Sequence, residues 1–198
     1  MKMRIRLSLL FGLLCAMLLS MTSFEAVCDD LRENVLRLHI IANSDSTEDQ
    51  NLKLKIRDEI LKQTGAAFVD ANCLDAAEAE AEKRLSQFTE IANKVIKENG
   101  FDYKAEVYLG DSYFETREYD TFTLPAGNYR SLIIKLGEAK GKNWWCVVFP
   151  SVCVPAAAEQ DLRTSVNDES ATVAEQSDRY IIKFKTVEIY EKIKSWFN

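Results

Sequence analysis

The segment from Leu36 to Leu61, LRLHIIANSDSTEDQNLKLKIRDEIL, constrains the fold most, because it predicts a strand, a polar turn and a helix in direct succession. Its first residues alternate between apolar and polar side chains, which is the period of a half-buried strand. The turn-forming residues that follow place the start of the helix near Ser46. That helix carries an apolar stripe that can pack back on the strand: Leu52, Ile56 and Ile60. We expect this unit to be the seed of the core.

The acidic turn after the strand has two interpretations. Asp45 with Glu48, or Ser46 with Asp49, has the spacing at which two side chains satisfy the free N–H groups of a helix start. A calcium loop that began at Asn43 would need glycine at its sixth position and glutamate at its twelfth, and neither residue is there. The turn therefore predicts a helix cap, and no metal site.

Residues 1–27 are typical of a secretory signal, with basic residues before an apolar run from Leu7 to Leu19 and small residues after it. The run is shorter than the about 20 apolar residues of a membrane span. We expect export, with cleavage of the signal and its retention as an N-terminal membrane anchor both open. Residues 28–198 are expected to form a single domain.

Composition excludes one class of partner and weakens the case for catalysis. A net charge of −6 and a pI near 5.0 disfavour nucleic acid as a partner. No G-x-S-x-G, H-E-x-x-H, P-loop or paired C-x-x-C motif is present, so no cofactor or metal is expected. A cysteine-dependent enzyme would have to use the single histidine, His39, with Cys146. We therefore expect a binding or signalling protein that is not an enzyme.

The middle of the chain predicts a helix followed by strands. After a break at 65–72, apolar residues recur at helical spacing over 74–99, and Gly100 supplies a left-handed end. This helix is expected to pack on a sheet, with a coiled-coil partner as the alternative. A hairpin is expected next, with a turn at Gly110–Ser112 and strands over 103–109 and 113–124. Two further strands follow, over 129–136 and 143–150.

The last part of the chain predicts a flexible loop over 156–178, a short strand over 181–185 and an amphipathic helix over 186–197. The apolar face of that helix packs on the domain, or else lies at a membrane interface or in a partner's groove, and comprises Ile189, Tyr190, Ile193, Trp196 and Phe197. The fold class is therefore α+β: one mixed or antiparallel sheet of about five strands, two N-terminal helices on one face and a C-terminal amphipathic helix.

Two further patterns are open to more than one interpretation. Cys146 and Cys153 flank Pro150 in a segment that can fold back to form a disulfide, and two small buried side chains are the alternative. Trp144 and Trp145 must point to opposite faces of their strand. Either both are covered by the protein's own helices, or one is exposed as an interface anchor.

The strings IIANSDSTEDQNLKLKIRDEIL and LPAGNYRSLIIKLGEAKGKNWWCVVFPSVC resemble the stage II sporulation protein R family of endospore-forming bacteria. The resemblance covers about Leu31 to Cys153 and, more loosely, the aromatic C-terminal helix. It implies a signalling protein exported across the forespore membrane into the septal intermembrane space. The implied partner is a membrane-embedded aspartic protease of the mother cell, of the stage II sporulation protein GA type, which processes the sigma-E precursor.

Two other functions stay open beside this one: an envelope or septal structural protein, and the cysteine-dependent envelope enzyme. A ligand can activate a receptor only by binding its active form more tightly, so it needs a contact surface with anchor residues. We expect this surface where the resemblance is densest, in the turn and on the neighbouring aromatic strands: Asn43, Asp45, Asp49, Tyr129, Trp144 and Trp145.

Overall fold

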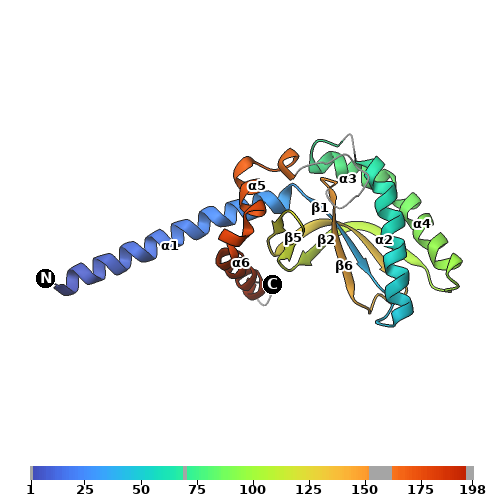
Figure 1. Cartoon of the computed structure of the whole chain (residues 1–198), viewed down its shortest axis with the longest axis horizontal. Helices are drawn as coiled ribbons and strands as arrows, with labels where there is room; N and C mark the ends of the chain where they lie inside the picture. The colour runs from blue at the N-terminus through green and yellow to red at the C-terminus, as the bar shows by residue number, and fades with distance from the viewer. Residues whose placement is uncertain (1, 69–70, 152–161, 195–198) are drawn as a thin grey trace. The chain divides into compact units, whose positions relative to one another are not determined.

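The computed structural model describes residues 2–68, 71–151 and 162–194, and Figure 1 labels its α-helices and the strands of its main sheet. Contacts divide the chain into two compact units. The first comprises residues 1–31, 115–127 and 167–198, and the second comprises residues 32–114 and 128–166. The expected division into a signal of residues 1–27 and one domain of residues 28–198 stays a prediction.

The second unit contains a four-stranded mixed sheet in the order β2-β5-β1-β6. Its strands are β1 (Leu36–Ile41), β2 (Ala105–Phe114), β5 (Gly127–Leu136) and β6 (Asn143–Phe149). The central strand β1 is parallel to β5 and antiparallel to β6. Because β1 is flanked on both sides, the strand that leads into the polar turn lies in the middle of the sheet.

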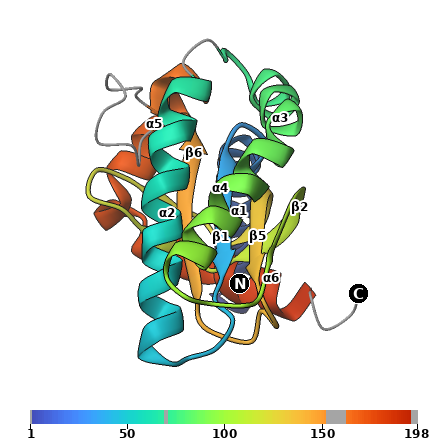
Figure 2. The ribbon, with the colours of Figure 1, turned by 90° about the vertical axis from the view of Figure 1, so that its right-hand side faces the viewer.

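Three helices of the second unit pack on one face of this sheet: α2 (Thr47–Ala67), α3 (Leu74–Lys83) and α4 (Leu85–Glu98). Figure 2 shows α2 and α4 lying over the strands. Alternate residues of the strands meet the apolar stripe of α2 in one core, which includes Leu38, Ile40, Ile56, Leu132 and Ile134, each 0 % exposed. The α+β class and the helices on one face are confirmed.

The predicted helix over 74–99 is two helices, because the chain leaves helical geometry at Arg84, where φ is −104° and ψ is 4°. The N–H of Arg84 donates to the carbonyl of Ala81 at 3.0 Å, a tightened turn that ends α3. Neither glycine nor proline marks this point, so the spacing of apolar residues could not show it. The expected break at 65–72 begins later, since α2 runs to Ala67. Gly100 has the predicted positive φ, at 79°.

The predicted hairpin at Gly110–Ser112 is wrong, because these residues continue the ten-residue strand β2. A Cβ at Gly110 would lie 3.2 Å from Ile133 Cδ1 and 3.3 Å from a ring carbon of Tyr108. The missing side chain thus makes room for a neighbour within the sheet and does not serve a turn. Among the described residues, this reduces the main sheet to four strands. A small hairpin follows instead, with β3 (Arg117–Glu118) paired to β4 (Thr123–Leu124).

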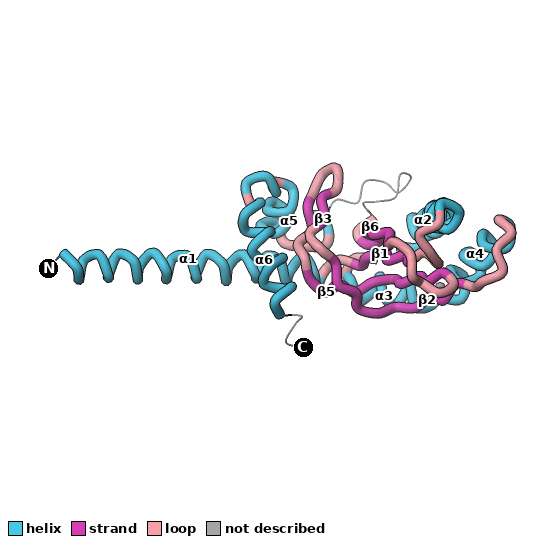
Figure 3. The backbone as a smooth tube through the Cα atoms, turned by 90° about the horizontal axis from the view of Figure 1, so that it is seen from below, coloured by secondary structure: helices cyan, strands magenta, loops and turns pink. Residues whose placement is uncertain are grey.

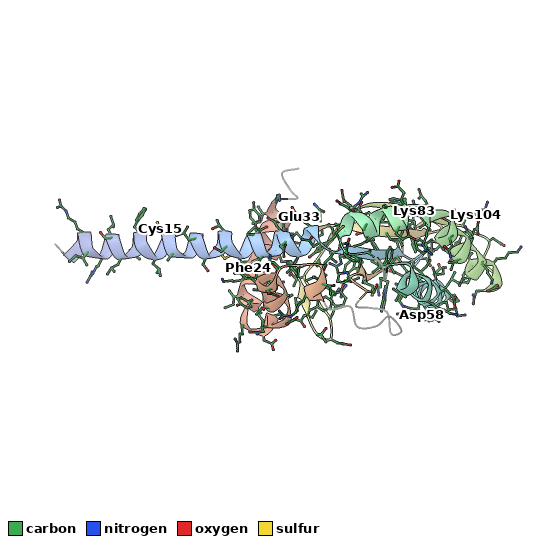
Figure 4. All side chains as sticks on the ribbon, turned by 90° about the horizontal axis from the view of Figure 1, so that it is seen from above. Cys15, Phe24, Glu33, Asp58, Lys83 and Lys104 are labelled. Carbon is green, nitrogen blue, oxygen red and sulfur yellow. The ribbon has the colours of Figure 1, made fainter. Side chains whose placement is uncertain are left out.

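The first unit contains α1 (Lys2–Glu33) up to Leu31, the small hairpin, α5 (Asp168–Glu175) and α6 (Ile181–Lys194). Phe24 of α1 packs edge-on against Phe184 of α6, with ring centroids 5.2 Å apart, and Figure 4 labels Phe24 at this packing site. Within the described ranges, no helix combines the length and the apolar character needed to cross a membrane.

Two sequence predictions for the first unit are wrong. Residues 168–175, expected within a loop, form α5, whose start is capped by Asn167 Oδ1 accepting from Ser170 N at 2.9 Å. Small residues such as Ala171 and Ala174 give this helix its buried side, so its composition resembles that of a loop. Residues 181–185 are helical and not a strand, because Phe184 and Val187 together form a buried helical stripe. Trp196 and Phe197 lie outside the described residues.

Candidate functional site

The turn after β1 and the first two turns of α2, which together we call the polar elbow (residues 43–53), are organised around the carboxylate of Asp49. This side chain is 3 % exposed. Its Oδ2 accepts from Asn43 Nδ2 at 2.8 Å and from Ser44 Oγ at 2.5 Å, and its Oδ1 accepts from the hydroxyl of Tyr103 at 2.6 Å. Three side chains from two parts of the chain therefore converge on one carboxylate.

The elbow is also bound to the connection between β5 and β6, residues 137–142. Asn43 Oδ1 accepts from the backbone N–H of Glu138 at 2.9 Å, and the carbonyl of Asn43 accepts from Lys140 N at 3.1 Å. The ammonium of Lys53 donates to the carbonyl of Lys142 at 2.8 Å. In Figure 3 the connections that follow β1 and β5 are drawn as loops. The two connections thus form one hydrogen-bonded structure at one end of the sheet.

The cap of α2 is Ser46, which resolves the two alternatives. Ser46 Oγ accepts from the N–H of Asp49 at 3.1 Å, as expected for a cap residue and the third residue of its helix. Asp45 has a different role, because its Oδ1 accepts from Lys142 N at 2.7 Å. Asp45 therefore binds the β5–β6 connection while remaining exposed.

Electrostatics in the elbow follow from burial and hydrogen bonding. Burial alone would raise the pKa of Asp49, but the hydrogen bonds from Ser44, Tyr103 and Asn43 together lower it. Burial raises the pKa of Tyr103 far above its ordinary value, and the hydrogen bond to Asp49 adds to this. Burial lowers the pKa of Lys53, against the attraction of Asp45. These hydrogen bonds thus favour the ionised form of Asp49, which in turn holds the elbow together.

The opposite face of the sheet carries a cluster of aromatic rings around Arg37. This arginine is 0 % exposed, and its guanidinium carbon lies 3.8 Å from the ring centroid of Phe114 and 4.7 Å from that of Tyr129. The rings of Phe114 and Tyr129 are edge-on at 5.6 Å. Because Tyr129 is only 1 % exposed, its ring serves this cluster and is not presented as an interface anchor.

The two tryptophans point to opposite faces of β6, as the strand period requires. Trp144 lies on the helix side, with the guanidinium carbon of Arg57 at 4.3 Å from its ring centroid. Trp145 lies on the other side, where its ring is 6.3 Å from that of His39 and 5.7 Å from that of Phe114. Both side chains are half-buried, so neither is an isolated exposed aromatic.

His39 and Cys146 do not form a catalytic pair. His39 is opposite Trp145 in the register of β1 and β6, whereas Cys146 is opposite Leu38 and packs in the core on the helix side. The two side chains therefore lie on opposite faces of the sheet, and His39 Nδ1 is instead 3.1 Å from Ser112 Oγ. Cys153 lies outside the described residues, so its pairing with Cys146 stays a prediction.

His39 gives a test of this packing through pH. Burial lowers the pKa of His39, and the charges of Arg37 and Lys135 add to this, against a hydrogen bond with Asn143. An unfolded chain then takes up the proton near pH 6.5 before the folded chain does. We expect the free energy of unfolding to fall as pH drops through 6.5, and this loss to be absent from His39→Gln. Urea denaturation at several pH values measures it, and an unchanged slope in the variant would contradict the assignment.

The sequence predicts part of this arrangement and not the rest. The structure brings together Asn43, Asp45 and Asp49, and places Trp144 opposite Ile40, three residues before Asn43. It separates Tyr129 and Trp145 from them on the other face. Tyr103, Arg37 and Phe114 were not predicted; a lone arginine among alternating apolar residues of a central strand is the one available signal. No group of three potential metal ligands occurs among the residues that the structure describes.

The fold and these two clusters define an α+β protein. Its main polar network, in the polar elbow, consists of hydrogen bonds between the protein's own side chains and backbone. The chain belongs to the stage II sporulation protein R family, whose model matches residues 32–159. It is similar to stage II sporulation protein R of Bacillus subtilis (strain 168), with 31 % identity over 166 residues that cover 81 % of this chain and 74 % of that protein. No solved structure matches the chain. The family match begins where the second unit begins, at Arg32.

Proposed function

We propose that this protein is an exported signal of sporulation that activates a membrane-embedded aspartic protease of the mother cell, and so leads to processing of the sigma-E precursor. Membership of the stage II sporulation protein R family carries this proposal, since it gives the chain a role in sporulation. The basic and apolar residues at the N-terminus support export. The proposed site of action is the septal intermembrane space, reached across the forespore membrane.

Binding without turnover is the mode of action that the side chains support best. The enzyme alternative depends on His39 with Cys146, and these side chains are on opposite faces of the sheet. An envelope or septal structural protein is the remaining alternative, which predicts self-association or a requirement for large amounts. A signal instead predicts that a small amount acts through one surface of the folded protein.

The elbow end of the sheet is the contact surface we propose for the protease. Asp45 is exposed there, and Trp144 lies on the helix side of the sheet, opposite Ile40 near the end of β1. Asp49 and Tyr129 are buried, so they support surfaces rather than touch a partner. Trp145, next in sequence to Trp144 but on the opposite face, is the matched control that the chain offers.

Processing of the precursor is expected only when this protein is exported into the compartment of the protease. The experiment co-expresses protease and precursor in a host that does not sporulate, with this chain carrying its N-terminal segment or lacking residues 1–27. Processed precursor is measured beside the thermal stability of Asp45→Ala, Trp144→Ala and Trp145→Ala. We expect loss of processing in Trp144→Ala at a temperature where it is folded, with Trp145→Ala reduced only as its stability falls.

The possible outcomes of this experiment test the proposed function and the proposed contact surface separately. No processing by the exported, folded wild-type chain would refute activation of the protease. Processing that follows stability in all three variants would leave the function intact and refute the elbow surface. Loss of precursor processing in Trp145→Ala alone would mean that the contact surface is on the aromatic face of the sheet instead.

A further inference from the structure

Helix α6 has two apolar sides, and only one of them packs against the protein. Phe184 and Val187 are 3 % and 1 % exposed. On the opposite side, at spacings of seven and four residues, lie three isoleucines that share one helix face: Ile182, Ile189 and Ile193, exposed by 83 %, 54 % and 45 %. The apolar face expected from the sequence is therefore partly the outer face, whereas Glu191 is 6 % exposed.

Lysines border the outer isoleucine stripe on both sides. Lys185 and Lys192 are seven residues apart and lie along one border, and Lys194 lies along the other. Lys183 precedes Lys194 on that second border, but its ammonium lies 5.3 Å from the ring centroid of Phe24, within the unit. Tyr190, 54 % exposed, stands beside Lys194, whose ammonium is 5.9 Å from the ring centroid. The outer half of α6 thus combines an apolar stripe with cationic edges.

The acidic residues of α6 are confined to its inner half. Glu188 and Glu191 lie on the half of the helix that holds the buried residues, and the carboxylate of each is close to one lysine. The distances are 2.7 Å from Lys185 Nζ to Glu188 and 3.5 Å from Lys194 Nζ to Glu191. No carboxylate therefore faces outward from this helix, although the whole chain has a net charge of −6.

We propose that the outer face of α6 lies on the surface of a membrane that contains anionic phospholipid, with its isoleucines at the boundary between headgroups and acyl chains. A helix with an apolar face between lysine borders is suited to this plane, because long lysine side chains reach the headgroups while the stripe enters the acyl boundary. Each lysine near such a surface adds a factor of about five in affinity. The net negative charge of the anionic headgroup is the feature that the lysines recognise.

The same unit supports this choice over a protein groove. The N-terminal part of α1 belongs to this unit and carries exposed apolar side chains, among them Leu9, Leu10 and Phe11 at 64–69 %. A groove that receives one helix would match the stripe alone, whereas lysines along both borders match a plane of negative charge. The proposal depends on α6 and not on which protease the protein acts upon.

The test places the photocrosslinker p-benzoylphenylalanine at Ile189 of the full chain, and, as a control, at Gln176, which is exposed in the same unit. Each protein is incorporated into vesicles of phosphatidylcholine with or without phosphatidylglycerol, irradiated and analysed by mass spectrometry. We expect phospholipid adducts at Ile189 in the anionic vesicles, several-fold more than at Gln176 and several-fold more than in phosphatidylcholine alone.

Charge variants make the test specific. Lys185→Gln with Lys192→Gln is expected to reduce adducts at Ile189 by about fivefold or more, whereas Lys97→Gln with Lys104→Gln, an equal change of charge on the second unit, leaves them unchanged. Equal lipid adducts at both crosslinker positions would overturn the proposal. So would crosslinks from Ile189 mainly to a second copy of the chain or to the chain's own second unit.

Discussion

Replacing Asp49 with alanine is expected to lower the free energy of unfolding by about 4 kcal/mol, because it removes the acceptor on which the elbow converges. Asn43, Ser44 and Tyr103 would each retain a donor with no carboxylate to receive it. The start of α2 would also lose a negative charge in its first turn. Urea denaturation of wild type and variant measures the difference.

Matched variants show whether the carboxylate itself is responsible. Asp58→Ala removes an exposed carboxylate from the same helix and is expected to cost at most about 0.5 kcal/mol. Asp49→Asn should cost about 2 kcal/mol, because the amide oxygen still accepts from Asn43 and Ser44. Since the folded pKa of Asp49 is lowered, its contribution is complete above its ordinary pKa of 3.8 and is lost as pH falls through the folded value. Equal costs for Asp49→Ala and Asp58→Ala would contradict the role of the network.

Local sequence pattern was sufficient where neighbouring residues determine the structure. The strand β1, the cap at Ser46 and the apolar stripe of α2 each depend on contacts within a few residues, and each is confirmed, although β1 is buried on both faces and not half-buried. The sequence also predicts one sheet that joins this strand to the later ones, and β1 pairs with β5 and β6. The α+β class follows from these same elements.

Sequence pattern failed where a distant partner decides the outcome. Tyr103 binds Asp49 from 54 residues away, so nothing near either residue indicates the contact. Gly110 is followed by turn-forming residues, but glycine is favoured there because the side chain of Ile133 on the neighbouring strand leaves little room for a Cβ. In α6, both sides of the helix are apolar, and only tertiary packing determines that Phe184 is inside and Ile182 outside. Glycines in particular carry no local sign of which neighbour requires them.

Gly141→Ala is the second large effect, with an expected loss of about 3 kcal/mol in the free energy of unfolding. A Cβ at Gly141 would overlap the backbone carbonyl of Ser44 and lie 3.0 Å from the Cβ of Ala42. Neither backbone can withdraw freely, because Gly141 N donates to the carbonyl of Ala42 at 2.9 Å and Lys142 N donates to Asp45. The added methyl group must therefore separate the elbow from the β5–β6 connection. Thermal or urea unfolding measures the loss.

The chain supplies the control for this experiment in Gly100. Its φ of 79° is left-handed, but a Cβ there would meet nothing within 4 Å, so Gly100→Ala should cost only about 1 kcal/mol of backbone strain. Gly141 has no such strain, so any excess over Gly100→Ala measures the close approach of the two connections. If the two variants lose the same stability, the close approach of the elbow to the β5–β6 connection adds nothing to the stability of the fold.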